Sequence, residues 1–202
     1  MKYFITAIGT DCGKTLISAI FCEKLKADYW KPIQTGNIFD SETIRDFVSF
    51  QIVIHPETYA LNFPLSPHQA AKLEDKIISL EDFILPATTN DLIIEGAGGL
   101  LVPLNENGDF VLDFIEKENI GIVLVIRLYL GCINHALLSI NELKRRNLTI
   151  SGLVFNGLDD FGAVRIISRL SGLKTMLHVY HEEMITPQII QQYSEKLHLN
   201  GN

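Results

Sequence analysis

The sequence is poor in cysteine, and this shortage excludes several kinds of protein. It has three cysteines in 202 residues, Cys12, Cys22 and Cys132. Their spacing fits neither a zinc site nor a redox dithiol, and an odd number favours a reducing compartment over a disulfide-rich secreted domain. We therefore expect all three to be small buried side chains.

An excess of positive charge and a long hydrophobic run are also missing. The formal net charge is −7, which argues against a sequence-independent grip on nucleic-acid phosphates. No apolar run reaches the roughly 18 residues that a membrane helix needs, and the N-terminus lacks the layout of a signal peptide. We expect a cytoplasmic protein with no nucleic-acid or membrane partner.

Strand-like and helix-like segments alternate along the chain. Some strand-like segments, such as 92–94 and 122–126, are continuous apolar runs, which is typical of parallel strands covered on both faces. We predict strands at 2–8, 29–32, 91–95, 121–126, 150–155 and 176–180, and helices at 14–26, 67–74, 80–85, 109–118, 134–146, 161–171 and 187–197. The pattern predicts one α/β domain over 1–202, a doubly wound, mostly parallel sheet with helices on both faces and ligands at the carboxyl ends of its strands.

The segment 9–15, Gly-Thr-Asp-Cys-Gly-Lys-Thr, lies between the first predicted strand and an amphipathic helix. This placement is typical of a nucleotide site. Exposed N–H groups and a helix N-terminus face the phosphates, Lys14 reaches the terminal ones, and Thr15 can ligate Mg²⁺. The usual pattern needs glycine at position 8, where this chain has Ile8. We therefore predict a variant nucleotide site in a P-loop NTPase-like fold.

Polar residues also follow the second and third predicted strands. Lys31 is costly to bury without an anion, and with a phosphate loop on the neighbouring strand it is best interpreted as a second cation for a transferring phosphate. Asp40 fits either a helix N-cap or a Mg²⁺ ligand. Glu95 ends a buried strand and precedes the glycine-rich segment 96–99. We interpret it as a carboxylate that binds Mg²⁺ directly or through water.

Asn134 and Asn156 can each be interpreted either as a ligand-binding residue or as a structural one. The helix that begins near Gly131 has free N–H groups that could receive a carboxylate, while Asn134 could simply cap that helix. Asn156 ends another predicted strand, where it could hydrogen-bond a base edge or start a turn.

Five motifs follow one another along the chain. They are Gly-Thr-Asp-Cys-Gly-Lys-Thr at 9–15, Lys-Pro-Ile-Gln-Thr-Gly at 31–36, Ser-Pro-His-Gln-Ala-Ala at 66–71, Glu-Gly-Ala-Gly-Gly-Leu-Leu-Val-Pro-Leu at 95–104 and Leu-Gly-Cys-Ile-Asn-His-Ala-Leu-Leu at 130–138. Together they resemble the dethiobiotin synthetase family, over about 2–157. The resemblance implies a ligase of biotin formation that uses 7,8-diaminononanoate, CO₂, ATP and Mg²⁺. One amine captures CO₂ as a carbamate, the carbamate attacks the γ-phosphate, and the second amine closes a cyclic urea.

The same resemblance implies roles for individual residues. Lys14 and Lys31 would neutralise charge on the carbamate and the γ-phosphate, and Thr35 would contact the diamine. Because family members are homodimers, Gly131 and Asn134 are expected to serve the substrate carboxylate across the dimer. The expected Mg²⁺ ligands are Thr15, Asp40 and Glu95, and the expected ATP contacts are Asp11, Cys12, Gly13, Lys14, Thr15, Leu16, Asp40, Glu95, Gly96, Ala97, Gly98, Asn156 and Gly157.

The chain departs from the family near its C-terminus. Where members usually have an Ile-Pro pair it has Val-Tyr-His at 179–181, so we assign no base contact there. Three other functions compete. A partitioning or switch ATPase would have an extra lysine where this chain has Gly9, and an amidotransferase-type synthetase would need room for a glutaminase domain. A non-catalytic nucleotide-binding relative would not need both Lys14 and Lys31.

Overall fold

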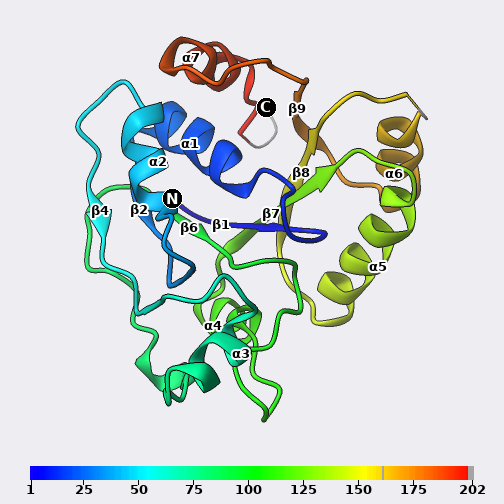
Figure 1. Ribbon diagram of the computed structural model, residues 1–202. Helices are drawn as coiled ribbons and strands as arrows, with labels where there is room; N and C mark the ends of the chain where they lie inside the picture. The colour runs from blue at the N-terminus through cyan, green and yellow to red at the C-terminus, as the bar shows by residue number, and fades with distance from the viewer. Residues whose placement is uncertain (161, 200–202) are drawn as a thin grey trace.

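The predicted apolar strands form one sheet in the computed structural model, which describes residues 1–160 and 162–199 (Figure 1). Seven parallel strands lie in the order β4-β2-β6-β1-β7-β8-β9. On one side of β1 the chain forms β2 and β4 before β6 inserts between β1 and β2, and from β7 onward it adds strands in sequence on the other side. The expected doubly wound α/β class is therefore confirmed. The strands are β1 (Lys2–Ala7), β2 (Asp28–Trp30), β4 (Ile54–His55), β6 (Leu92–Glu95), β7 (Gly121–Arg127), β8 (Ile150–Asn156) and β9 (Thr175–Val179).

Successive strand residues face opposite helical layers, which explains the continuous apolar runs. Ile5 and Val123 pack toward α1 (Lys14–Leu25), α2 (Asp40–Phe47) and α7 (Pro187–Lys196). Phe4 packs on the opposite side toward α3 (Pro67–Leu73) and α4 (Val111–Glu118), and Leu124 packs toward α5 (Cys132–Arg145) and α6 (Ala163–Ser171). Figure 1 shows the two layers on either side of the sheet.

The segment after β2 differs from the prediction. We predicted a strand over 29–32, but β2 ends at Trp30 because Pro32 has no N–H to donate to a neighbouring strand. The Pro32 carbonyl instead accepts a hydrogen bond from the Tyr59 N–H at 3.0 Å. The chain then forms a separate two-stranded parallel sheet of β3 (Ile33–Thr35) and β5 (Tyr59–Leu61). Lys31 therefore lies just beyond the carboxyl end of β2, at the carboxyl edge of the main sheet.

Most predicted helices are present with shifted ends. The segment 80–85 forms only the 3₁₀ turn η1 (Leu80–Asp82), because Leu85 precedes Pro86 and a residue before proline avoids the helical conformation. Helix α4 begins at Val111, where the Asp113 carboxylate accepts the Phe110 N–H at 2.7 Å. Position 161, the predicted start of another helix, lies outside the described residues, and α6 begins two residues later.

The cysteines confirm one further expectation. All three cysteines are buried and free, as expected. Among the described helices, none has both the length and the apolar character needed to cross a membrane.

Candidate active site

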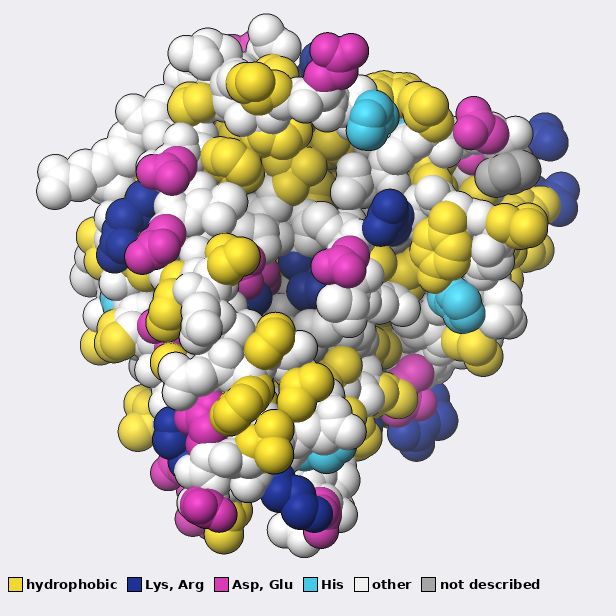
Figure 2. All heavy atoms as spheres, viewed as in Figure 1, with side chains coloured by type: hydrophobic (Ala, Val, Ile, Leu, Met, Phe, Trp, Pro, Cys, Tyr) yellow, Lys and Arg dark blue, Asp and Glu magenta, His cyan; other side chains and the backbone are white. Residues whose placement is uncertain are grey.

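The carboxyl ends of β1, β2 and β6 border one cavity of about 1020 Å³. Figure 2 shows the hollow, with basic and acidic side chains at its floor. We had placed the loop 9–15 and Lys31 on neighbouring strands, but β6 lies between β1 and β2. Glu95, at the end of β6, therefore lies between the two lysines. The predicted site residues that line this cavity are Asp11, Gly13, Lys14, Thr15, Lys31, Thr35, Asp40, Glu95, Ala97 and Gly98.

The loop 9–15 turns sharply into α1 through two residues with positive φ. Asp11 has φ 55° and Gly13 has φ 90°, and a Cβ at Gly13 would overlap the Asn156 side-chain amide. Only glycine fits that position. The backbone N–H groups of residues 11–16 donate no hydrogen bond to any residue that the structure describes. Consecutive free N–H groups at a helix N-terminus form a site for an anion.

Lys14, the first residue of α1, is 8% exposed. Its ammonium donates to the Gly9 carbonyl at 3.4 Å, a long contact. Burial lowers the pKa of Lys14, the carboxylate of Glu95 opposes that change, and the nearby Lys31 adds to it, so the pKa lies below its ordinary value. A buried ammonium with so weak a partner is poised to bind an anionic ligand.

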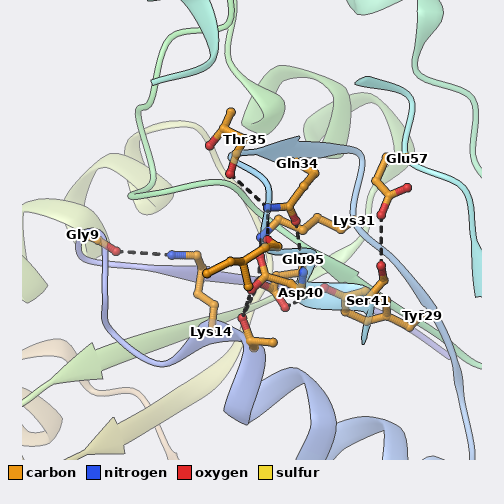
Figure 3. Close-up of polar contacts among 12 residues, drawn as sticks. Gly9, Lys14, Tyr29, Lys31, Gln34, Thr35, Asp40, Ser41, Glu57 and Glu95 are labelled. Carbon is orange, nitrogen blue, oxygen red and sulfur yellow. Dashed lines mark hydrogen bonds and ion pairs between the residues drawn. The ribbon is translucent and has the colours of Figure 1, made fainter. Parts of the chain in front are cut away.

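Lys31 lies against the carboxylates of Asp40 and Glu95 (Figure 3), and all three residues line the cavity. Lys31 is 6% exposed, forms an ion pair with Asp40 and donates to Glu95 Oε1 at 3.0 Å. Burial alone would lower the pKa of Lys31, but the carboxylates of Glu95 and Asp40 outweigh burial and raise it. Thr15 Oγ1 lies 3.0 Å from Asp40 Oδ1 and 3.0 Å from Glu95 Oε1. The cluster is thus one connected polar network.

Two residues that we did not assign support this network. The Tyr29 hydroxyl donates to Glu95 Oε2 at 2.9 Å, and burial followed by the Glu95 charge raises the pKa of Tyr29 well above its ordinary value. Gln34 accepts the Asp40 N–H at 3.2 Å and donates to the Ile38 carbonyl at 2.9 Å. Gln34 could have been found, because it is a polar residue within the 31–36 motif. No pattern in the sequence indicates that the Tyr29 hydroxyl points toward Glu95.

Thr15, Asp40 and Glu95 form a set of oxygen donors that fits Mg²⁺. Magnesium is usually bound by one or two carboxylates together with substrate phosphates and water. Within the described residues, no group of three or more His, Cys, Asp or Glu side chains is arranged to hold a metal ion. The two carboxylates and the hydroxyl could supply part of a Mg²⁺ coordination shell.

A second cavity of about 530 Å³ adjoins the other side of the loop. Asp11 and Gly13 line both cavities, and Leu16 lines the second. Asn156 and Gly157, at the end of β8, also line it. All of these were predicted as ATP contacts. Arg127, at the end of β7, lines this cavity too and was not predicted.

The remaining wall of the second cavity comes from the segment after β9, to which we assigned no role. It contributes Tyr180, His181 and Glu182. The Tyr180 ring stacks on His178, with centroids 4.2 Å apart. The Tyr193 hydroxyl accepts the Tyr180 N–H at 3.1 Å and donates to Glu182. This wall is therefore anchored to α7.

Four predicted residues lie outside the linings of both cavities. Cys12 is buried, so only its backbone can face a ligand. Gly96 packs against Phe4, which a Cβ would approach to 2.9 Å. Gly131 and Asn134 are exposed at the start of α5.

The sequence matches a family model described as an AAA domain over residues 1–188. It is 53% identical over 199 residues to an ATP-dependent dethiobiotin synthetase of Cytophaga hutchinsonii, covering 97% of this chain and 96% of the relative. It is 43% identical over 198 residues to the enzyme of the same name from Christiangramia forsetii, covering 96% of this chain and 95% of the relative.

The fold is similar to that of a solved cell-division ATPase, MinD of Pyrococcus furiosus. The TM-score is 0.61 at 12% identity, covering 96% of this chain and 97% of the other. At this identity the likeness shows a common P-loop NTPase-like fold and nothing about activity. The sequence relationships are much stronger and extend over nearly the whole chain. This chain is therefore a member of the ATP-dependent dethiobiotin synthetase family.

Proposed function

We propose that this protein forms dethiobiotin from 7,8-diaminononanoate and CO₂ at the expense of ATP, in a reaction that requires Mg²⁺. The observation that carries the proposal is the shared cavity of Lys14 and Lys31 beside Thr15, Asp40 and Glu95. Transfer of a phosphoryl group needs positioned positive charge rather than a protein nucleophile. The family relationship supports the identity of the substrates.

The nucleotide would lie across the two cavities. Its phosphates would accept hydrogen bonds from the free N–H groups of residues 11–16, with Lys14 at the terminal phosphates. Thr15, Asp40 and Glu95 would hold Mg²⁺, which when bound neutralises phosphate charge. The base would extend past Leu16 toward Asn156 and Gly157. The segment 96–98 would approach the nucleotide through its backbone.

The proposed chemistry proceeds through two unstable intermediates. One amine of the diamine adds to CO₂ and loses a proton, giving a carbamate. A carbamate oxygen attacks the γ-phosphorus and releases ADP, which leaves a carbamic–phosphoric anhydride. The second amine attacks the carbonyl carbon, the C–O bond to phosphate breaks, and a cyclic urea and phosphate result. Lys31 would stabilise the negative charge on the carbamate and on the transferring phosphate.

The lining of the first cavity also suits an aliphatic diamine. Apolar side chains there alternate with a few polar groups, a lining typical of small-molecule sites. Thr35 would contact the diamine. The apolar side chains that line this cavity include Ile33, Ile38, Leu65 and Val102.

We further propose that the whole chain, 1–202, is one ATP-binding synthetase domain that works as a homodimer in the cytoplasm, without a nucleic-acid or membrane partner. Gly131 and Asn134 do not line either of the two cavities described above but are exposed at a helix N-terminus. In a dimer they would reach the substrate carboxylate of the second copy. The free cysteines suit a reducing compartment.

Incubation with the diamine, ¹³C-bicarbonate, Mg²⁺ and each nucleoside triphosphate, followed by mass spectrometry, tests the function. We expect dethiobiotin that carries one ¹³C atom, with phosphate released in equal amount, and neither product when the diamine or Mg²⁺ is omitted. Phosphate release that ignores the diamine and bicarbonate would contradict the proposal and indicate a switch-type ATPase. The triphosphate panel would also establish the preferred base.

A further inference from the structure

Two side chains from the sheet bind consecutive carbonyl groups of the loop 9–15. Arg127, the last residue of β7, donates from Nη1 to the Asp11 carbonyl at 3.2 Å. Asn156, the last residue of β8, donates from Nδ2 to the Cys12 carbonyl at 2.9 Å. Strands β7 and β8 pair in register at these two residues. The two donors therefore project from adjacent points at the carboxyl edge of the sheet.

These hydrogen bonds fix the direction of the N–H groups that follow. In a planar trans peptide the C=O and the next N–H point in opposite directions. Binding the Asp11 carbonyl therefore aims the Cys12 N–H, and binding the Cys12 carbonyl aims the Gly13 N–H. Both N–H groups are among those that donate to no described residue.

Without external donors this loop geometry is costly. Asp11 has φ 55°, a left-handed conformation that non-glycine residues adopt rarely and usually only where neighbouring groups hold them. The Arg127 guanidinium supplies such a restraint at that residue.

We propose that Arg127 and Asn156 are positioning residues that hold the N–H groups of Cys12 and Gly13 toward the nucleotide phosphates. The proposal rests on the proposed function, because it needs a phosphorylated ligand in the loop. It gives Asn156 a role toward the phosphates through the backbone, apart from any contact that its side chain makes with the base. Arg127 acts on the loop that binds the ligand and need not touch the ligand itself.

Calorimetric binding of ATP, inorganic triphosphate and AMP tests the proposal. In Arg127→Met we expect affinity for ATP and for inorganic triphosphate to fall by about tenfold, the usual loss for one hydrogen bond from a charged donor. AMP, which has no β- or γ-phosphate, should change less than about twofold. Arg127→Lys keeps a cationic donor and should recover most of the loss.

Asn156→Ala separates the two roles of the amide. If Asn156 positions the loop, inorganic triphosphate should bind about tenfold more weakly. If only its contact with the base matters, affinity for inorganic triphosphate will be unchanged, and the Asn156 part of the proposal is overturned. Lys144→Met is the matched control, because Lys144 also donates to a backbone carbonyl, that of Ser171 at 2.7 Å, but lies away from both cavities. It should leave all three affinities unchanged.

NMR of the ligand-free protein distinguishes positioning from direct contact with phosphate. We expect the ¹⁵N order parameters of the Cys12 and Gly13 amides to fall in Arg127→Met and to recover in Arg127→Lys. Unchanged order parameters together with weakened ATP binding would overturn the proposal, since Arg127 would then act on the phosphate itself. If the wild-type protein binds neither ATP nor inorganic triphosphate, the proposed function fails instead.

Discussion

Strand β2 has a buried charge at each end, and the two charges are satisfied in different ways. Asp28 begins the strand at 3% exposure and accepts hydrogen bonds from Thr88 at 2.7 Å and Asn90 at 2.8 Å. His55 Nε2 lies 3.0 Å from the same carboxylate. Lys31 follows the other end of the strand and pairs with Asp40 and Glu95 in an open cavity.

Asp28 is enclosed by partners within the fold, whereas Lys31 faces the cavity that we propose binds the ligands. Burial of either charge is costly without partners. The partners of Asp28 are side chains from neighbouring segments, so interactions within the fold offset the free-energy cost of burying its charge. The partners of Lys31 are carboxylates that line the cavity themselves, so this group can exchange partners when ligands bind. Substitutions at the two ends should therefore affect different properties.

The largest expected effect is the loss of turnover in Lys31→Ala. We expect dethiobiotin formation to fall by about 10³-fold or more, because charge on the carbamate and transferring phosphate loses a preorganised cation. ATP should still bind within a few-fold of wild type, since the proposed role of Lys31 is at the carbamate more than at the nucleotide. A mass-spectrometric cyclisation assay and calorimetry would measure the two. Near-normal turnover would remove Lys31 from its proposed role.

Lys14→Ala can be compared directly with Lys31→Ala, because both lysines line the same cavity. Lys14 begins α1, and among the described residues its ammonium has only the Gly9 carbonyl as a hydrogen-bond partner, at 3.4 Å. Its proposed place is at the terminal phosphates, so this variant should impair both ATP affinity and rate. If both lysine variants changed ATP affinity and rate to the same extent, the two ammonium groups would not have the separate roles proposed for them.

The next largest expected effect is the loss of stability in Asp28→Asn, at the first residue of β2. Asp28→Asn exchanges an acceptor of several hydrogen bonds for an amide, and we expect the free energy of unfolding at pH 7 to fall by about 2 kcal/mol. Turnover should stay within about twofold of wild type, because unfolding is still rare. Urea denaturation measures the change. Glu106→Gln, which alters an exposed ion pair with Lys72, is the control and should leave the midpoint unchanged.

The stability difference at Asp28 should also depend on pH. Burial acts to raise the pKa of Asp28, but hydrogen bonds from Thr88, Asn90 and His55 outweigh it, so the folded pKa lies below its ordinary value. Such a group stabilises the fold above its unfolded pKa and loses that contribution as pH falls through its folded pKa. The gap between wild type and Asp28→Asn should therefore narrow below about pH 4. A gap that stays constant from pH 7 to pH 3 would contradict this account.

Much of the fold could be predicted from local sequence. Runs such as 122–126 leave no polar face, so they require a strand covered on both sides. The Gly-Lys-Thr at 13–15 likewise marks the start of a helix at a strand end. These signals lie within a few residues of one another, and the structure confirms the elements they predict.

The arrangement of the site depended on contacts that no local pattern encodes. The position of β6 between β1 and β2 places Glu95 beside Lys31, yet strand order is set by packing across the whole sheet. Arg127 precedes the 130–138 motif without belonging to it, and its partner lies 116 residues earlier in the chain. The end of β2 is different: because Pro32 has no N–H to donate, the sequence could have predicted that the strand ends at Trp30.

Tyr29 lies between Asp28 and Lys31 in the sequence, and its hydroxyl gives the smallest expected effect. Tyr29→Phe keeps the buried ring and removes the donor to Glu95 Oε2 at 2.9 Å. Because groups behind a metal-binding carboxylate tune affinity, we expect the Mg²⁺ concentration for half-maximal turnover to rise by about tenfold. The free energy of unfolding should fall by about 1 kcal/mol or less. Tyr3→Phe is the control, since within the described part of the chain the Tyr3 hydroxyl has only a weak contact with Met1 Sδ at 3.8 Å. If both variants keep the wild-type Mg²⁺ requirement, the Tyr29 hydroxyl belongs with Asp28 as a structural group rather than with Lys31 and the site.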